Sequence, residues 1–138
     1  MPEPSADSRT GFFSVIRLFK AALYTTRGLR HALTNDTSFR QEVVLVLILT
    51  PISIWLGDNG IERAMLILPL LLVLAVELLN SAVETIVDRV GTEYNELSGR
   101  AKDLSSAAVF VALINVPVVW GLVLLGLAGW KAVGPTRG

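Results

Sequence analysis

The chain lacks cysteine and has a single histidine, His31, among its 138 residues. Without thiols it has neither a disulfide framework nor thiol chemistry, and one histidine excludes a metal cluster built from several imidazoles. Charged residues are also scarce, at 17% of the chain, whereas 52% of the residues are hydrophobic. A soluble domain of this length would not normally carry such long uncharged runs, so the composition favours a small polytopic membrane protein.

Three apolar runs are each close to the ~20 residues that cross ~30 Å of hydrocarbon. We expect spanning helices at about residues 37–56, 64–87 and 107–130. Residues 12–33 carry a basic stripe opposite an aromatic-rich apolar face, which predicts an amphipathic helix lying in the membrane interface. The predicted fold class is therefore an all-α membrane protein with one surface helix and three transmembrane helices.

The sequence also predicts the domain bounds and the orientation of the chain in the membrane. Residues 1–10 are predicted to be disordered, residues 11–127 to form one integral-membrane domain, and residues 128–138 to contain the end of the third span and a short tail. Ser38 and Gln41 have the spacing of a capping box, so Ser38 is predicted to cap the first span. Lysine and arginine are concentrated before that span and in the second loop, which puts the N-terminus and second loop in the cytoplasm and the C-terminus outside.

The second apolar run is unusual because it contains ionisable side chains. On a helix, five polar residues of this region fall within roughly an 80° stripe: Glu77, Asn80, Ser81, Glu84 and Asp88. An ionisable group at membrane depth costs at least about 2.5 kcal/mol on insertion scales, so such residues are candidates for function. The alternative is a set of polar contacts between helices, a role that Asn80 and Ser81 could fill.

The residue types suggest phosphoryl transfer. A helical rise of 1.5 Å per residue puts Asp36 and Glu84 at one level near the cytoplasmic boundary, with Glu77 roughly 10 Å deeper. Carboxylates at that level can hold Mg²⁺, although Asp36 could equally be a turn or cap residue. Nearby basic residues can bind phosphates, and a recessed carboxylate suits a general base. No GxxxxGK[ST] or GxGxxG motif occurs, so the residues alone indicate a metal-dependent site at the membrane interface.

Three segments closely resemble the prokaryotic diacylglycerol kinase family. They are RGLRHALTNDTSFRQE (27–42), VELLNSAVETIVDRVGTEYNELSGRAKD (76–103) and SSAAV (105–109). The family signature E-x-x-N-S-A-[IV]-E is present from Glu77 to Glu84, and the resemblance extends over roughly residues 11–127. It implies a homotrimer of the bacterial inner membrane, with a periplasmic C-terminus, that transfers the γ-phosphoryl group of ATP to diacylglycerol and forms phosphatidic acid.

The resemblance also implies roles for individual residues. Glu77 would be the general base, Asn80 would support the catalytic geometry, and Asp36 and Glu84 would hold Mg²⁺ on the ATP phosphates. Further positions match residues that hold the nucleotide: Arg17, Tyr24, Glu93, Asn95, Lys102 and Asp103. Positions that match the lipid site are Arg17, Ser38, Phe39, Arg40, Gln41, Glu42, Trp55, Arg63, Glu77 and Ser106. The family commonly has glutamate at the position of Asp36, and histidine can occur at that of Asn95.

Other functions stay open at this point. A kinase of the same family could act on undecaprenol, a proton- or ion-handling subunit could use the stripe as a relay, and a structural assembly protein could use it for helix contacts. A three-helix monomer has little interior in which to hide Glu42, Glu77 and Glu84 from lipid. We therefore expect active sites that are shared between subunits of the trimer.

Overall fold

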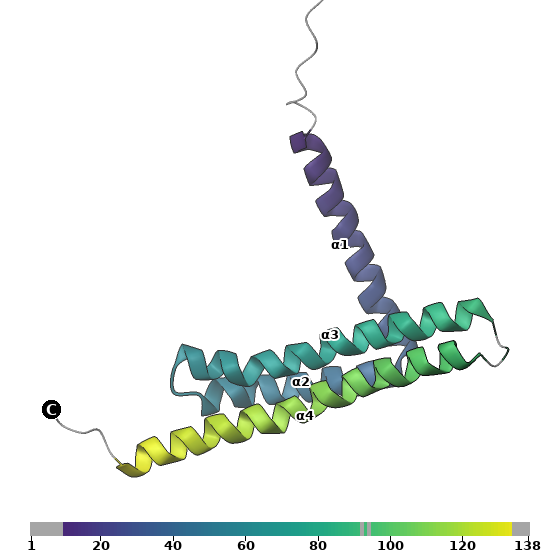
Figure 1. Cartoon of the computed structure of the whole chain (residues 1–138). Helices are drawn as coiled ribbons and strands as arrows, with labels where there is room; N and C mark the ends of the chain where they lie inside the picture. The colour runs from purple at the N-terminus through teal and green to yellow at the C-terminus, as the bar shows by residue number, and fades with distance from the viewer. Residues whose placement is uncertain (1–9, 92, 94, 134–138) are drawn as a thin grey trace, which may run out of the picture. The chain divides into compact units, whose positions relative to one another are not determined.

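A computed structural model of the chain describes residues 10–91, 93 and 95–133, which form four α-helices and no strand. These helices are α1 (Thr10–Asn35), α2 (Thr37–Leu56), α3 (Gly60–Val90) and α4 (Glu96–Val133) (Figure 1). The chain divides into two compact units, of which Met1–Asp36 contains α1 and Thr37–Gly138 contains the other three helices. The predicted disorder at the N-terminus and most of the predicted tail fall on residues 1–9 and 134–138, outside the described residues.

Helices α2, α3 and α4 are each long and apolar enough to cross a membrane, as judged by length and composition. This confirms the predicted all-α class with three spans. Short turns join the three helices, so neighbours in the sequence run antiparallel, and α3 packs against both α2 and α4 (Figure 1). Because α4 has 38 residues, it is about 57 Å long and extends well beyond ~30 Å of hydrocarbon.

The helices begin where side chains can satisfy their free N–H groups. Asn59 caps α3, since its Oδ1 accepts hydrogen bonds from the backbone N–H groups of Ile61 (3.0 Å) and Glu62 (3.1 Å). The Glu62 carboxylate accepts in turn from the backbone N–H of Asp58 at 2.7 Å and from Nδ2 of Asn59 at 2.8 Å. This reciprocal arrangement resembles a capping box and explains why α3 starts several residues before its apolar run.

The predicted cap at Ser38 is wrong. Helix α1 continues to Asn35 and α2 begins at Thr37, so only Asp36 separates the two helices. Ser38 therefore lies inside the first turn of α2, past the position of a cap. The Oγ1 of Thr37, the first residue of α2, accepts a hydrogen bond from the guanidinium group of Arg40 at 3.0 Å.

The core of the three-helix unit is a narrow seam along α3. Its buried side chains include Leu66, Leu70, Val73 and Glu77, which recur at helical spacing and so share one face. Helix α2 adds Phe39, Glu42, Val46 and Ser53, and α4 adds Ala112. Most other large apolar side chains of the three spans are exposed, as expected for helices whose outer surfaces meet lipid or other membrane helices.

Each span contains one proline, at positions 51, 69 and 117. Pro69 has no N–H and so leaves the carbonyl of Met65 without its usual helical donor. At the adjacent carbonyl, that of Leu66, the indole Nε1–H of Trp120 donates a hydrogen bond across from α4 at 3.0 Å. This bond ties α4 to the turn of α3 that Pro69 interrupts, although the carbonyl that proline frees is that of Met65.

Candidate active site

A cavity of about 470 Å³ lies among the three spanning helices. Each helix contributes residues three or four positions apart, which share one helical face. The lining residues are Ser38, Gln41, Glu42 and Leu45 from α2, Glu77, Asn80 and Glu84 from α3, and Ser106, Val109 and Leu113 from α4. The polar stripe predicted on the second span therefore faces a cavity rather than lipid along much of its length.

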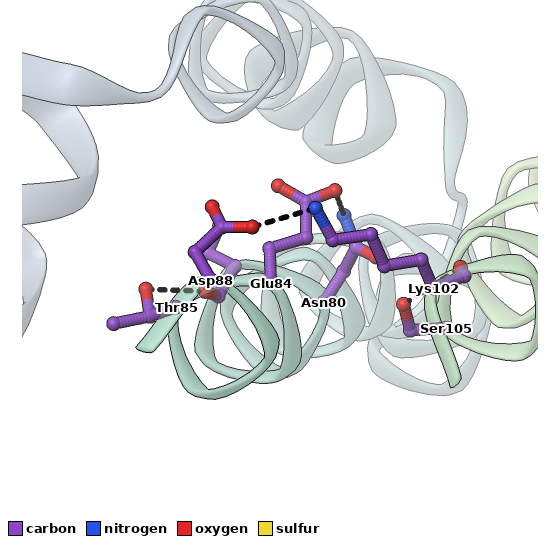
Figure 2. A network of polar contacts seen from close by, with 7 residues as sticks. Asn80, Glu84, Thr85, Asp88, Lys102 and Ser105 are labelled. Atoms are coloured by element: carbon purple, nitrogen blue, oxygen red, sulfur yellow. Dashed lines mark hydrogen bonds and ion pairs between the residues drawn. The ribbon is translucent and has the colours of Figure 1, made fainter. Parts of the chain in front are cut away.

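The carboxylates of this cavity differ in exposure. Glu77 and Glu42 are buried, at 2% and 8% of their full exposure, whereas Glu84 is exposed. Asn80 lies between Glu77 and Glu84 in the sequence of α3, and its Nδ2 donates a hydrogen bond to Oε1 of Glu84 at 3.3 Å (Figure 2). Within the described part of the chain the buried Oδ1 of Asn80 has no hydrogen-bond donor. A buried acceptor without a donor is costly, so this oxygen is suited to receive a hydrogen bond from a bound hydroxyl.

A second cavity, of about 360 Å³, lies where α3 ends and α4 begins. It is lined by Val87, Asp88, Gly91, Glu93, Asn95, Ser98, Gly99 and Lys102. Gly91 ends α3 at φ 150°, a backbone conformation that favours glycine. Asn95 begins α4, and its Oδ1 accepts from the backbone N–H groups of Leu97 (2.9 Å) and Ser98 (3.2 Å) as an N-cap.

One ion pair joins the two helices at this cavity. Nζ of Lys102 donates to Oδ1 of Asp88 at 2.7 Å (Figure 2). Lys102 precedes the apolar run of α4 and lies outside the hydrocarbon-spanning part of the helix. The hydrogen bond that Lys102 donates to Asp88 raises the pKa of the lysine most; burial opposes this effect, and the negative charges of Asp88 and Glu84 add to the increase. The lysine is therefore a full positive charge held beside two carboxylates.

The structure brings together only some of the residues that the sequence suggested. Together with the predicted metal ligand Glu84, the first cavity includes six of the predicted catalytic and lipid-site residues: Ser38, Gln41, Glu42, Glu77, Asn80 and Ser106. The second includes three predicted nucleotide residues, which are Glu93, Asn95 and Lys102. Arg17, Tyr24 and Asp36 belong to the first unit, which is described by itself.

Five other predicted residues lie elsewhere in the three-helix unit. Phe39 is in the core at 2% exposure, and Trp55 is 82% exposed toward the other end of α2. Arg40 donates to Thr37. Arg63 donates through Nε to the backbone carbonyl of Gly57 at 3.1 Å, which fixes the turn between α2 and α3. Asp103 is exposed on α4 and is not among the residues that line the second cavity.

Sequence reasoning gave no role to eight residues that line the cavities, which are Leu45, Val109 and Leu113 in the first and Val87, Asp88, Gly91, Ser98 and Gly99 in the second. Asp88 had been placed on the polar stripe, and its pairing with Lys102 depends on how α3 and α4 pack. Leu45, Val109 and Leu113 form apolar walls of the first cavity. Helical spacing could have found the last two, because Ser106, Val109 and Leu113 follow an i, i+3, i+7 pattern.

The carboxylates fit a hard cation that also binds phosphate. Among the described residues no three acidic or histidine side chains gather into a group that could hold a metal ion. Mg²⁺ does not need such a cage, since it usually keeps several waters and binds one or two carboxylates together with substrate phosphates. Glu84 suits that role because it is exposed at the cavity and hydrogen-bonded to Asn80.

Comparison with known proteins identifies the family. A family model described as "Prokaryotic diacylglycerol kinase" matches residues 23–124. The diacylglycerol kinase of Escherichia coli K12 is 50% identical over 119 residues, which cover 86% of this chain and 95% of that protein. Those of Haemophilus influenzae and Pseudomonas aeruginosa are 53% and 46% identical over 107 and 110 residues, covering 78% and 80% of this chain and 91% and 89% of the relatives. A match of this extent, on a chain with three spanning helices and the signature residues around one cavity, shows that the protein belongs to the prokaryotic diacylglycerol kinase family.

Proposed function

We propose that the protein transfers the γ-phosphoryl group of ATP to the free hydroxyl of diacylglycerol and forms phosphatidic acid. The observation that carries this proposal is the cavity among the spanning helices, where a buried Glu77 lies with Asn80 and the more exposed Glu84. The family and the names of its members support diacylglycerol as the acceptor. We place the reaction at the cytoplasmic face of the bacterial inner membrane, with the C-terminus in the periplasm, as the distribution of lysine and arginine favours.

The first cavity would receive the lipid. Its apolar walls suit the glycerol backbone and the first acyl carbons, and Ser38, Gln41 and Ser106 supply polar contacts for the ester groups. Glu77 would take the proton of the free hydroxyl as its oxygen attacks the γ-phosphorus. The bond between that phosphorus and the β–γ bridging oxygen then breaks, and ADP leaves. Asn80 would orient the hydroxyl through Oδ1 while holding Glu84 through Nδ2.

The second cavity would receive the nucleotide. Lys102 would bind the phosphates, and Glu93 and Asn95 would lie against the nucleoside, with Asp103 as a further contact. Glu84 would hold Mg²⁺, which when bound supplies neutralising charge to the phosphates. Glu77 and Glu84 are seven residues apart on α3, about 10 Å along the axis. With this spacing the proposed metal ligand Glu84 would lie between the proposed base Glu77 and the second cavity.

We propose a homotrimer in which the sites are shared between subunits. The spans leave most of their large apolar side chains exposed, and a further groove between α3 and α4 contains Asn115 among apolar residues. A polar residue at that depth is better accommodated against another helix than against lipid. Co-assembly of Glu77→Gln subunits with Glu84→Gln subunits should restore activity that neither variant has alone. Mixed trimers without activity would contradict shared sites.

The direct test is transfer of labelled γ-phosphate from MgATP to diacylglycerol in mixed micelles. We expect labelled phosphatidic acid from the wild type and a loss in kcat of about 10²- to 10⁴-fold for Glu77→Gln, the usual contribution of a general base. Glu42→Gln is the matched control, since it neutralises another buried glutamate of the same cavity and should mainly raise the KM for lipid. Equal loss of kcat in both variants would contradict the assignment of Glu77 as the base.

The same assay separates the acceptors. Undecaprenol at the matched surface concentration should give much less product than diacylglycerol. If undecaprenol is the better acceptor, the proposed phosphoryl transfer stands but its lipid substrate is undecaprenol. Absence of product with both acceptors would refute the kinase proposal and favour a proton relay along α3.

A further inference from the structure

The ion pair between Lys102 and Asp88 differs from an ordinary surface pair. It joins two helices, it lines the second cavity, and its Nζ to Oδ1 distance is 2.7 Å. A second pair, Arg100 with Glu96 at 3.1 Å, lies nearby, but both of its members are on α4 one turn apart, and neither lines this cavity. The Lys102–Asp88 pair therefore fixes a charge between two helices, whereas the Arg100–Glu96 pair lies on the surface of α4 alone.

The position of Lys102 matters because its side chain is long and flexible. A free lysine loses much rotamer freedom when it is held in one geometry, and this loss would otherwise accompany nucleotide binding. Asp88 already imposes a geometry, since it holds the ammonium group at the edge of the cavity, and Glu84 lies close enough to attract the same charge. Lys102 is half-exposed, with 42% of its side-chain surface accessible, so a phosphate can approach the ammonium group from the open side.

We propose that Asp88 is a positioning residue, which holds the ammonium group of Lys102 at the nucleotide cavity before ATP binds. This inference rests on the proposed function and assigns a role to a residue outside the catalytic carboxylates. Asp88 lies one turn of α3 beyond Glu84, so a single helix face carries the proposed metal ligand and the anchor of the phosphate-binding lysine. The role depends on contact with Lys102 and requires no direct contact between Asp88 and the nucleotide.

Charge repulsion alone predicts that removing Asp88 strengthens ATP binding, whereas the proposal predicts that it weakens binding. Asp88 is a negative charge beside a cavity that would receive a triphosphate, so removing it should strengthen ATP binding if charge repulsion were its main effect. If positioning is its main effect, Asp88→Asn should weaken ATP binding, because Lys102 must then be ordered by the nucleotide itself. The sign of the change therefore distinguishes the two effects.

The experiment measures binding of a non-hydrolysable MgATP analogue to the full-length protein in detergent micelles, together with steady-state kinetics. For Asp88→Asn we expect the Kd of the analogue and the KM for MgATP to rise about 3- to 10-fold, while kcat stays within about twofold. Asp88→Glu keeps the charge and can still reach Lys102, so it should recover most of the loss. Glu96→Gln removes the nearby exposed ion pair and should leave both constants unchanged.

A double-mutant cycle completes the test. In a Lys102→Met background Asp88→Asn should have no further effect on the Kd, since the group that it positions is gone. Unchanged or tighter binding by Asp88→Asn, or an equal effect in both backgrounds, would overturn the positioning role while the wild type still binds the analogue and transfers phosphate. A wild type that neither binds nor transfers would overturn the proposed function itself.

Discussion

The hydrogen bond from Trp120 to the carbonyl of Leu66 should be a measurable source of stability. It links α4 to the proline-containing part of α3 at 3.0 Å, and Leu66 is fully buried, with 0% exposure. Trp120→Phe removes the donor and keeps an aromatic ring. A sharper change replaces Trp120 with 3-benzothienylalanine, which keeps the shape of the indole and substitutes sulfur for its N–H.

The magnitude follows from the surroundings of the carbonyl. Hydrogen bonds between membrane helices average about 0.6 kcal/mol and reach about 1.7. The carbonyl of Leu66 keeps its helical donor, the N–H of Leu70, because Pro69 removes the donor of Met65 instead. We therefore expect each substitution to lower the free energy of unfolding by about 0.5–1.5 kcal/mol, with a further loss of packing in the phenylalanine variant.

The assay is reversible unfolding in mixed micelles by titration with a denaturing detergent, followed by circular dichroism. Trp55→Phe is the matched control, because Trp55 is 82% exposed on α2 and the same substitution there should change stability by less than about 0.5 kcal/mol. A benzothienyl variant as stable as the wild type would refute the reasoning. It would show that the hydrogen bond from the indole adds no net stability.

Two further predictions concern the turns that join the spanning helices. Gly57→Ala should destabilise the protein by about 1–3 kcal/mol in the same assay, because a Cβ there would lie 2.7 Å from Cγ of Arg63 and 2.9 Å from its backbone N. Gly60→Ala is its control, since a Cβ at Gly60 would meet no atom within 4 Å among the described residues; equal losses in the two variants would contradict the steric explanation. Asn95→Ala should cost about 1 kcal/mol through loss of a helix cap and speed amide hydrogen exchange in the first turn of α4, whereas Asn95→Asp should keep slow exchange. Loss of nucleotide affinity in Asn95→Ala without faster exchange would instead indicate that Asn95 contacts the nucleotide directly.

The sequence predicts the membrane-embedded part of the fold well, because length and apolar composition are what the bilayer requires. Helix α2 begins at Thr37 and ends at Leu56, the bounds predicted for the first span. The other two spans are longer than their apolar runs, since Asn59 and Asn95 cap them within polar segments. Ser38 had the spacing of a cap but not the position, because the preceding helix continues to Asn35.

The part of the candidate site that depends on the spacing along one helix could be predicted from the sequence, whereas the part that depends on helix packing could not. Glu77, Asn80 and Glu84 could be grouped from sequence, since a single helix sets their spacing. The walls from α2 and α4 and the pairing of Asp88 with Lys102 depend on which helix faces meet, and no local pattern determines that. Arg63 had been assigned to the lipid site by resemblance, yet its guanidinium group binds the turn at Gly57, a contact made only once the turn has folded.

The length of α3 and α4 has a consequence for how two unlike substrates meet. Both helices continue without interruption from the apolar seam to the polar end of the bundle, so residues of the same two helices line both the cavity proposed for the lipid and the cavity proposed for the nucleotide. The distance and the angle between residues of the two cavities are therefore fixed by the rise and rotation of the helix, about 1.5 Å and 100° per residue. A single residue inserted in α3 between Glu77 and Glu84 would turn one carboxylate out of the cavity. If the two cavities bind lipid and nucleotide as proposed, a continuous helix sets the distance between phosphoryl donor and acceptor.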